Sequence, residues 1–94
     1  MNRLVLQAQI LETAAIRYTP AGLPALDLML KHESMVDEAG SPRKVAMEIK
    51  AVALGDIVKR IQALSLTEKT VFTGFLSAQR QGRGTVFHIT GFAD

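Results

Sequence analysis

The sequence predicts an all-β fold with one short helix, and three observations support this prediction. Apolar and polar residues alternate with a period of two through most of the chain, as they do in half-buried strands. Clusters of Gly, Pro and Asp separate the alternating segments and are typical of turns. One segment, after Gly55-Asp56, has apolar residues at helical spacing instead. The 94 residues can form one modest core, so we expect residues 1–94 to be a single domain.

Composition excludes several classes of protein. The chain has no cysteine, which excludes disulfides and cysteine-based metal or thiol chemistry. It has no apolar run of about 18 residues for a membrane helix, and its N-terminus lacks the apolar run of a signal peptide. We therefore expect a cytoplasmic protein with no membrane partner. The net charge of +2 says little about partners, whereas 48% hydrophobic residues in so small a chain predict a homo-oligomer.

The first two strands are predicted from alternation. In the first strand Leu4, Leu6, Ala8 and Ile10 share one side, and in the second strand Leu26, Leu28 and Leu30 do so. Between them, Tyr18 to Pro24 contains two prolines and a glycine and predicts a turn. Asp37 to Pro42 is expected to interrupt the second strand, which would leave Met35 and Val36 as apolar residues in a polar loop.

The third strand is predicted to start at Arg43 and to run on to Leu54. In it Val45, Met47 and Ile49 alternate with Lys44, Ala46, Glu48 and Lys50. Asp56 is then expected to cap a helix that has Ile57, Ile61 and Leu64 on one face and Lys59 and Arg60 facing away from it.

A β-hairpin is predicted at the C-terminal end of the chain. Its strands, Thr70 to Leu76 and Thr85 to Thr90, are rich in β-branched and aromatic residues. The connection Gln79 to Gly84, which we call the basic finger, carries two arginines and no acidic residue. Guanidinium groups projecting from a rigid hairpin suit phosphate binding.

This order of elements matches a five-stranded Greek-key barrel of the oligonucleotide-binding type, the OB fold. That fold binds its ligands across strands two and three and with the loops that join strands one–two and four–five. Cationic and aromatic residues at these places are the predicted nucleic-acid-binding residues: Arg17, Tyr18, Arg43, Lys44, Lys50, Arg80 and Arg83. Arg17 has an alternative role, an ion pair with Glu12 across the turn.

No catalytic or metal site is predicted. His32 and Ser34 share a strand face, but a Cβ separation of about 6–7 Å and the lack of an orienting carboxylate disfavour a base and nucleophile pair. The sequence lacks phosphate-loop and metal-ligand motifs. We therefore expect no enzyme activity, no metal and no cofactor.

Several motifs together resemble the family of primosomal replication protein N. They are Asn2-Arg3-Leu4-Val5-Leu6, Arg17-Tyr18-Thr19-Pro20-Ala21-Gly22, Lys31-His32-Glu33-Ser34, Glu38-Ala39-Gly40 and Thr73-Gly74-Phe75-Leu76. Members of this family are small relatives of bacterial single-stranded-DNA-binding protein. The resemblance implies a homodimer of OB barrels that binds single-stranded DNA, acts with a restart helicase and other primosome proteins in replication restart, and is not an enzyme.

Three positions differ from the family pattern. Ala46 and Ser41 stand where aromatic residues are usual, and Glu33 stands near an expected cation. Tyr18 becomes the best stacking candidate, and we expect weak binding that depends mainly on phosphate contacts and falls steeply with salt. Two alternatives follow: an OB-fold adaptor for protein interactions with a weakened nucleic-acid site, and an RNA-binding OB module.

Overall fold

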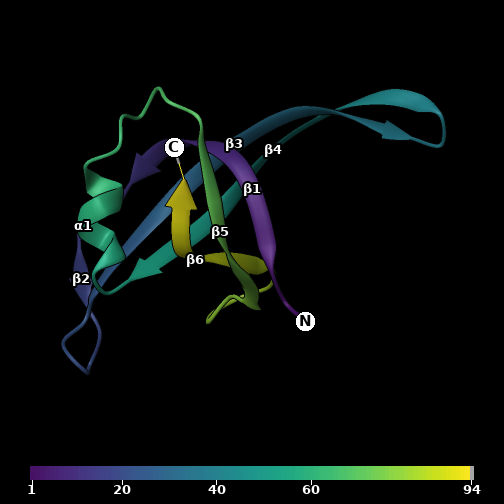
Figure 1. The fold of residues 1–94 in the computed structure, drawn as a ribbon. Helices are drawn as coiled ribbons and strands as arrows, with labels where there is room; N and C mark the ends of the chain where they lie inside the picture. The colour runs from purple at the N-terminus through teal and green to yellow at the C-terminus, as the bar shows by residue number, and fades with distance from the viewer. Residues whose placement is uncertain (94) are drawn as a thin grey trace.

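The computed structural model, which describes residues 1–93, is a closed β-barrel from which a long two-stranded arm projects (Figure 1). The elements are β1 (Leu4–Thr13), β2 (Arg17–Tyr18), β3 (Pro24–Glu38), β4 (Ser41–Leu54), α1 (Ile57–Gln62), β5 (Thr70–Ala78) and β6 (Thr85–Ala93). The strand order is β1-β5-β6-β4-β3-β2, and an additional pairing of β1 with β3 closes the barrel. β4 and β6 are parallel, whereas the other pairs are antiparallel. The predicted five-stranded OB barrel is confirmed, with β2 as a short addition to β3.

The core forms where the alternating apolar residues of the strands meet inside the barrel. Leu6, Ala8 and Ile10 of β1 and Leu26, Leu28 and Leu30 of β3 are all buried, as their period-two spacing predicted. Phe72 of β5 and Phe87 of β6 are fully buried between them. The residues between these core positions consequently lie on the outer face of the barrel.

The arm consists of the parts of β3 and β4 that extend beyond the barrel. β1 pairs with β3 no further along than Lys31, and β6 pairs with β4 only from Ala51, so the intervening residues of β3 and β4 pair with each other alone. The two strands are joined at Ala39 and Gly40, which have φ values of 54° and 82°. Positive φ at both central residues is what a two-residue hairpin needs to match strand twist.

The interruption predicted from Asp37 to Pro42 is shorter in the structure, where only Ala39 and Gly40 lie between the strands. Asp37 pairs with Pro42 and Glu38 with Ser41, so both strands continue to the turn. Proline is tolerated on edge strands, and both strands of the arm are edges. Met35 and Val36 lie in β3, opposite Lys44 and Arg43, and not in a loop.

The predicted turn from Tyr18 to Pro24 is shorter in the structure. Arg17 and Tyr18 form β2 and pair with Ala25 and Pro24 of β3. The turn itself is held by Thr19, whose carbonyl accepts from Gly22 N–H at 2.8 Å and whose N–H donates to Leu23 O at 2.9 Å. Arg17 and Tyr18 are thus on a strand at the edge of the sheet rather than in a free loop.

The helix α1 follows β4 and covers one end of the barrel (Figure 1). It buries Ile57, Val58 and Ile61, while Lys59 and Arg60 are exposed as predicted. Asp56 occupies the N-cap position, but its side chain makes no capping hydrogen bond because its own backbone is helical, with φ −62° and ψ −26°. Among residues 1–93 no helix is long and apolar enough to cross a membrane.

The predicted C-terminal hairpin is present as β5 and β6. The finger turn is closed by a hydrogen bond from Gln79 N to Gly84 O at 3.0 Å. In the middle of the hairpin the register shifts between Thr73 and Gly74, which is a β-bulge. A Cβ at Gly74 would collide with the carbonyl oxygen of His88 and would lie 2.8 Å from its carbonyl carbon, so glycine allows the two strands to approach.

Candidate nucleic-acid interface

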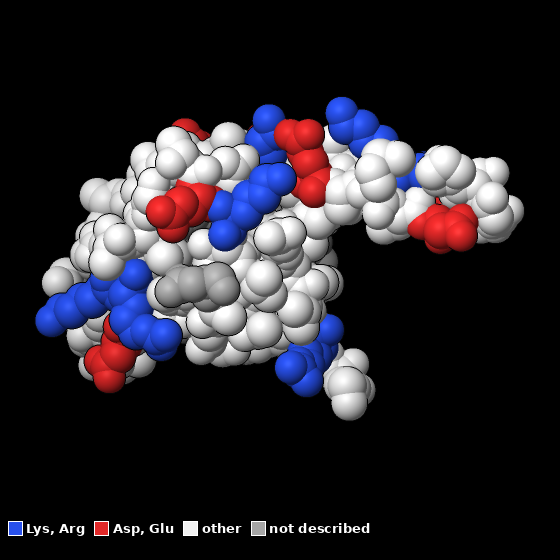
Figure 2. Space-filling view, turned by 45° about the horizontal axis from the view of Figure 1, so that its top comes forward, with Lys and Arg blue, Asp and Glu red and all other residues white. Residues whose placement is uncertain are grey.

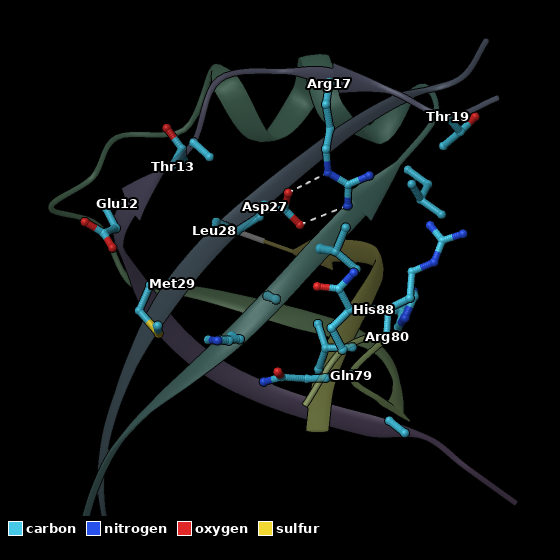
Figure 3. Close-up of a pocket in the computed structure, with 18 residues that line it drawn as sticks. Glu12, Thr13, Arg17, Thr19, Asp27, Leu28, Met29, Gln79, Arg80 and His88 are labelled. Atoms are coloured by element: carbon cyan, nitrogen blue, oxygen red, sulfur yellow. Dashed lines mark hydrogen bonds and ion pairs between the residues drawn. The ribbon is translucent and has the colours of Figure 1, made fainter. Parts of the chain in front are cut away.

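A groove of about 750 Å³ crosses the outer face of the barrel (Figure 3). Its floor is made by outward-facing residues of β3, β4 and β6, namely Asp27, Met29, Lys50, Val52, Leu54, Val86 and His88. The chain from Glu12 to Thr19 contributes to one side, and Ala78 to Gln81 contribute to the other. The groove therefore lies where an OB fold binds its ligands, between the connection after its first strand and the loop of its last hairpin.

Strand register places the floor residues next to one another. Asp27 is opposite Val52 and Met29 is opposite Lys50, so these four side chains share the outer face of β3 and β4. On the far side of β4, His88 of β6 is opposite Val52. Val52 is only 6% exposed although it faces outward, because neighbouring side chains cover it at the bottom of the groove.

Arg17 enters the groove from β2 and is held there by Asp27. Its Nε donates to Asp27 Oδ2 at 2.7 Å and its Nη2 donates to Oδ1 at 3.1 Å, a two-pronged pair drawn in Figure 3. The hydrogen bond and the charge of Asp27 raise the pKa of Arg17. The hydrogen bond from Arg17 lowers the pKa of Asp27, against the smaller opposing effect of burial. The alternative pairing of Arg17 with Glu12 is not the one that forms.

The basic finger places its two arginines differently. Arg80 lines the groove, whereas Arg83 is exposed on the turn outside it. Within residues 1–93 neither guanidinium forms an ion pair or a side-chain hydrogen bond. Both donors are therefore available to an anionic ligand.

The remaining predicted residues lie elsewhere. Tyr18 is 69% exposed on β2 and does not line the groove. Arg43 and Lys44 are on the arm, where Arg43 Nη1 pairs with Glu38 Oε1 at 2.8 Å. The structure thus brings together Arg17, Lys50 and Arg80 from the seven predicted residues and leaves Tyr18, Arg43, Lys44 and Arg83 outside the groove.

Basic side chains of the arm form ion pairs with acidic ones and do not form a continuous basic patch. Lys31 Nζ lies 3.1 Å from Glu33 Oε1. The hydrogen bond from Lys31, with the charges of Lys31, Lys44 and Lys69, lowers the pKa of Glu33. Figure 2 shows basic and acidic side chains interleaved along the arm and the barrel rather than one continuous basic stripe.

Comparison with known proteins places the chain in a family. Residues 2–91 match a family model described as another single-strand binding protein family. The chain is 51% identical to the replication restart protein PriB of Bordetella pertussis over 81 aligned residues. The alignment covers 86% of this chain and 76% of that protein. The chain belongs to the PriB family of replication restart proteins.

Other PriB proteins agree with this assignment. PriB of Nitrosomonas europaea is 30% identical over 89 residues, covering 94% of this chain and 82% of that protein. The solved structure of PriB from Ralstonia solanacearum has a TM-score of 0.89 and 32% identity, covering 99% of this chain and 96% of that chain. The single-stranded DNA binding protein of Thermus aquaticus has a TM-score of 0.74 at 24% identity, covering 99% of this chain and 49% of that chain, and shares the fold.

Several groove residues of this PriB-family chain were not predicted to be functional. They include Asp27 and Met29 of β3 and His88 of β6. Their outward position was already visible in the sequence, because Asp27 alternates with Leu26 and Leu28, and His88 with Phe87 and Ile89. The sequence did not show which strands pair with one another, and this pairing decides which side chains lie beside Asp27 and His88.

The Cβ separation expected between His32 and Ser34 does not keep the ends of their side chains apart. His32 Nε2 and Ser34 Oγ are hydrogen-bonded at 2.8 Å, and His32 Nδ1 lies 2.6 Å from Gln7 O. The imidazole is thus oriented by a backbone carbonyl and not by a carboxylate, and it lies outside the groove. Within residues 1–93 no group of three or more His, Asp and Glu could hold a metal ion.

Proposed function

We propose that this chain is an accessory single-stranded-DNA-binding protein of the primosome that assists helicase loading during replication restart. The observation that carries the proposal is the OB-fold groove with Lys50 on its floor and Arg80 on its wall, both without an acidic partner in residues 1–93. Its relatives are named replication restart protein PriB, and its family is described as single-strand binding. The role is one of binding, and a restart helicase and other primosome proteins are the proposed protein partners.

The mode of binding follows from the charges in the groove. Lys50, Arg80 and the exposed Arg83 would contact backbone phosphates, while the apolar side chains of Met29, Val52 and Val86 face the bases. Arg17 contributes less because Asp27 neutralises it. Few free cations imply weak binding without sequence preference.

A homodimer is part of the proposal. Leu4 to Ala8 of β1 pair with β5 along one edge, whereas β3 pairs with β1 only from Gln9 onward. The other edge of this segment has no strand partner within residues 1–93, although the Gln7 carbonyl on it is bound by His32, and Val5 beside it is 52% exposed. An open strand edge next to exposed apolar surface is a template for pairing with a second copy.

The proposal is tested by fluorescence anisotropy with labelled oligo-dT. The variant R80E/R83E removes the free donors of the finger, and we expect it to bind at least about tenfold more weakly at low salt, since two repulsive charges replace two attractive ones. The control R3E/K59E makes the same change of charge at exposed positions outside the groove and should bind like the parent. Equal affinity of both double variants would contradict the assignment of the groove.

An adaptor for protein interactions is the second candidate. It is favoured by the pairing of Arg17 and Arg43 with carboxylates, which neutralises two of the six cations among the predicted DNA-binding residues. If R80E/R83E abolishes DNA binding but leaves helicase binding and restart intact, the adaptor role is the correct one. Competition between matched DNA and RNA oligomers tests the RNA alternative.

A further inference from the structure

The chain has few aromatic rings with which to stack on bases. It contains one tyrosine, four phenylalanines and no tryptophan. Phe72 and Phe87 are fully buried, and Phe92 packs against the core with its ring 6.2 Å from that of Phe72. Tyr18 is exposed but lies outside the groove. This leaves Phe75, which is 38% exposed on the outer face of β5.

Phe75 is not isolated, because His88 of β6 stacks on it. The two residues are direct cross-strand partners after the bulge at Gly74. Their ring centroids are 4.7 Å apart and the ring planes are inclined by only 8°. Such near-parallel pairing is a favourable arrangement for two π systems, and it fixes the plane of the imidazole on the barrel surface.

His88 connects this stacked pair to the groove. β6 lies between β5 and β4, so the neighbours of His88 are Phe75 on one side and Val52 on the other. Phe75 does not line the groove, whereas His88, Val52 and Val86 do. The imidazole therefore has one face covered by Phe75, and Val52 lies on its other side at the bottom of the groove, where Figure 3 labels His88 among the lining residues.

We infer that His88, supported by Phe75, is the platform on which an unpaired base of the bound strand stacks. This inference rests on the proposed function and names the site of base contact within it. A base above the groove floor would extend the Phe75–His88 pair to a stack of three rings, with the apolar side chains of Val52 and Val86 beside it. Arg80 and Lys50 line the same groove and would hold the phosphates that flank this base.

The inference is tested by comparing oligo-dT with an abasic oligomer of equal length, which has the same phosphates and no bases. We expect the parent protein to bind oligo-dT about fivefold or more tighter, as one stacked base contributes at least that much. H88L should remove this preference while leaving the salt dependence unchanged, and H88F should restore it. Y18L, the control on the exposed tyrosine, should keep the preference of the parent.

A measurement on the unaltered protein covers the case in which H88L fails to fold. The chain has two histidines, and His32 lies outside the groove. On titration with oligo-dT, a stacked base should shift the ring protons of His88 upfield in the NMR spectrum and leave those of His32 in place.

The outcomes separate this inference from the proposed function. Equal binding of oligo-dT and the abasic oligomer, or unmoved His88 signals at saturation, would overturn the platform while leaving phosphate binding in the groove intact. A preference that is lost in Y18L and kept in H88L would overturn it in favour of Tyr18. If the parent binds neither oligomer, the proposed function fails, and the platform fails with it.

Discussion

At the scale of single residues, the pairing of Arg17 with Asp27 decides how much positive charge the groove presents. Both side chains are about half exposed, at 51% and 47%, so the pair contributes little to folding stability, about 0.2–1 kcal/mol. We expect its larger effect to be on binding, since Asp27 places a negative charge beside the proposed path for phosphates. The pair orients Arg17 and weakens it as a phosphate ligand at the same time.

Replacing this carboxylate by an amide should strengthen DNA binding. In D27N the guanidinium of Arg17 is released and one negative charge leaves the groove, so we expect about two- to fivefold tighter binding of oligo-dT at low salt. Anisotropy titration measures the change. E68Q removes the same charge from an exposed residue outside the groove and serves as control. If D27N binds oligo-dT no more tightly than E68Q does, the phosphates of the DNA do not contact Arg17.

The contacts of single residues also show what the sequence alone could not predict. Alternation placed Asp27 on the outer face of its strand, but it could not choose between Glu12 and Asp27 as the partner of Arg17. That choice depends on β2 pairing with β3 at Ala25, which brings Arg17 beside Asp27. Likewise the predicted strand from Thr85 to Thr90 did not indicate Phe75 as the neighbour of His88, because their register follows from the bulge at Gly74.

At the scale of elements, the β5–β6 hairpin links the basic finger to the barrel. The bulge at Gly74 sets the register of Phe75 with His88 and of the residues that lead to the finger. Close approach of the two backbones at this point requires that residue 74 have no side chain. The finger and the stacked pair therefore depend on one glycine.

The variant G74A should be strongly destabilised. The new methyl group would collide with backbone atoms of His88, which cannot turn aside as a side chain can. We expect a loss of about 3 kcal/mol or more in the free energy of unfolding, measured by urea denaturation. G91A is the matched control in β6, where the nearest atom to a Cβ is Thr73 Oγ1 at 3.2 Å, a side-chain atom. A G74A protein as stable as G91A would mean that the strands are not this close.

Strands were predicted well where the spacing of apolar residues within one segment defines them. They were predicted poorly where cross-strand pairing overrides the preference of the segment. The core strands followed from the spacing of Leu26, Leu28 and Leu30, and the finger hairpin followed from its β-branched flanks. The arm was missed because Asp37 and Pro42 are turn-forming residues by composition, yet each is held in a strand by the other. Such cross-strand support is a long-range effect that no local window contains.

At the scale of the whole molecule, the chain combines a small barrel with an arm that extends its long axis to 49 Å. The arm exposes apolar residues, Met35 at 65% and Val36 at 44%, and β1 presents an open edge near Val5. So small a barrel with this much exposed apolar surface is expected to associate.

Sedimentation equilibrium should accordingly give a mass twice the 10.2 kDa of one chain. V5E, which places a charge beside the open edge of β1, should shift the equilibrium toward the monomer. L66E is the control, because Leu66 is similarly exposed, at 55%, but belongs to the segment between α1 and β5. If L66E dissociates the dimer and V5E does not, the open edge is not the contact.

The groove as a whole is expected to bind DNA mainly through phosphate contacts, and the salt dependence of affinity tests this most directly. With about four phosphates engaged per dimer, binding of oligo-dT should weaken roughly 50-fold between about 50 and 200 mM salt, a log–log slope near −2.8. In R80A/R83A the slope should become shallower by at least about 1.4, as each lost contact removes about 0.7. A parent affinity that stays nearly constant over this range, or a slope unchanged in R80A/R83A, would contradict phosphate binding by the finger.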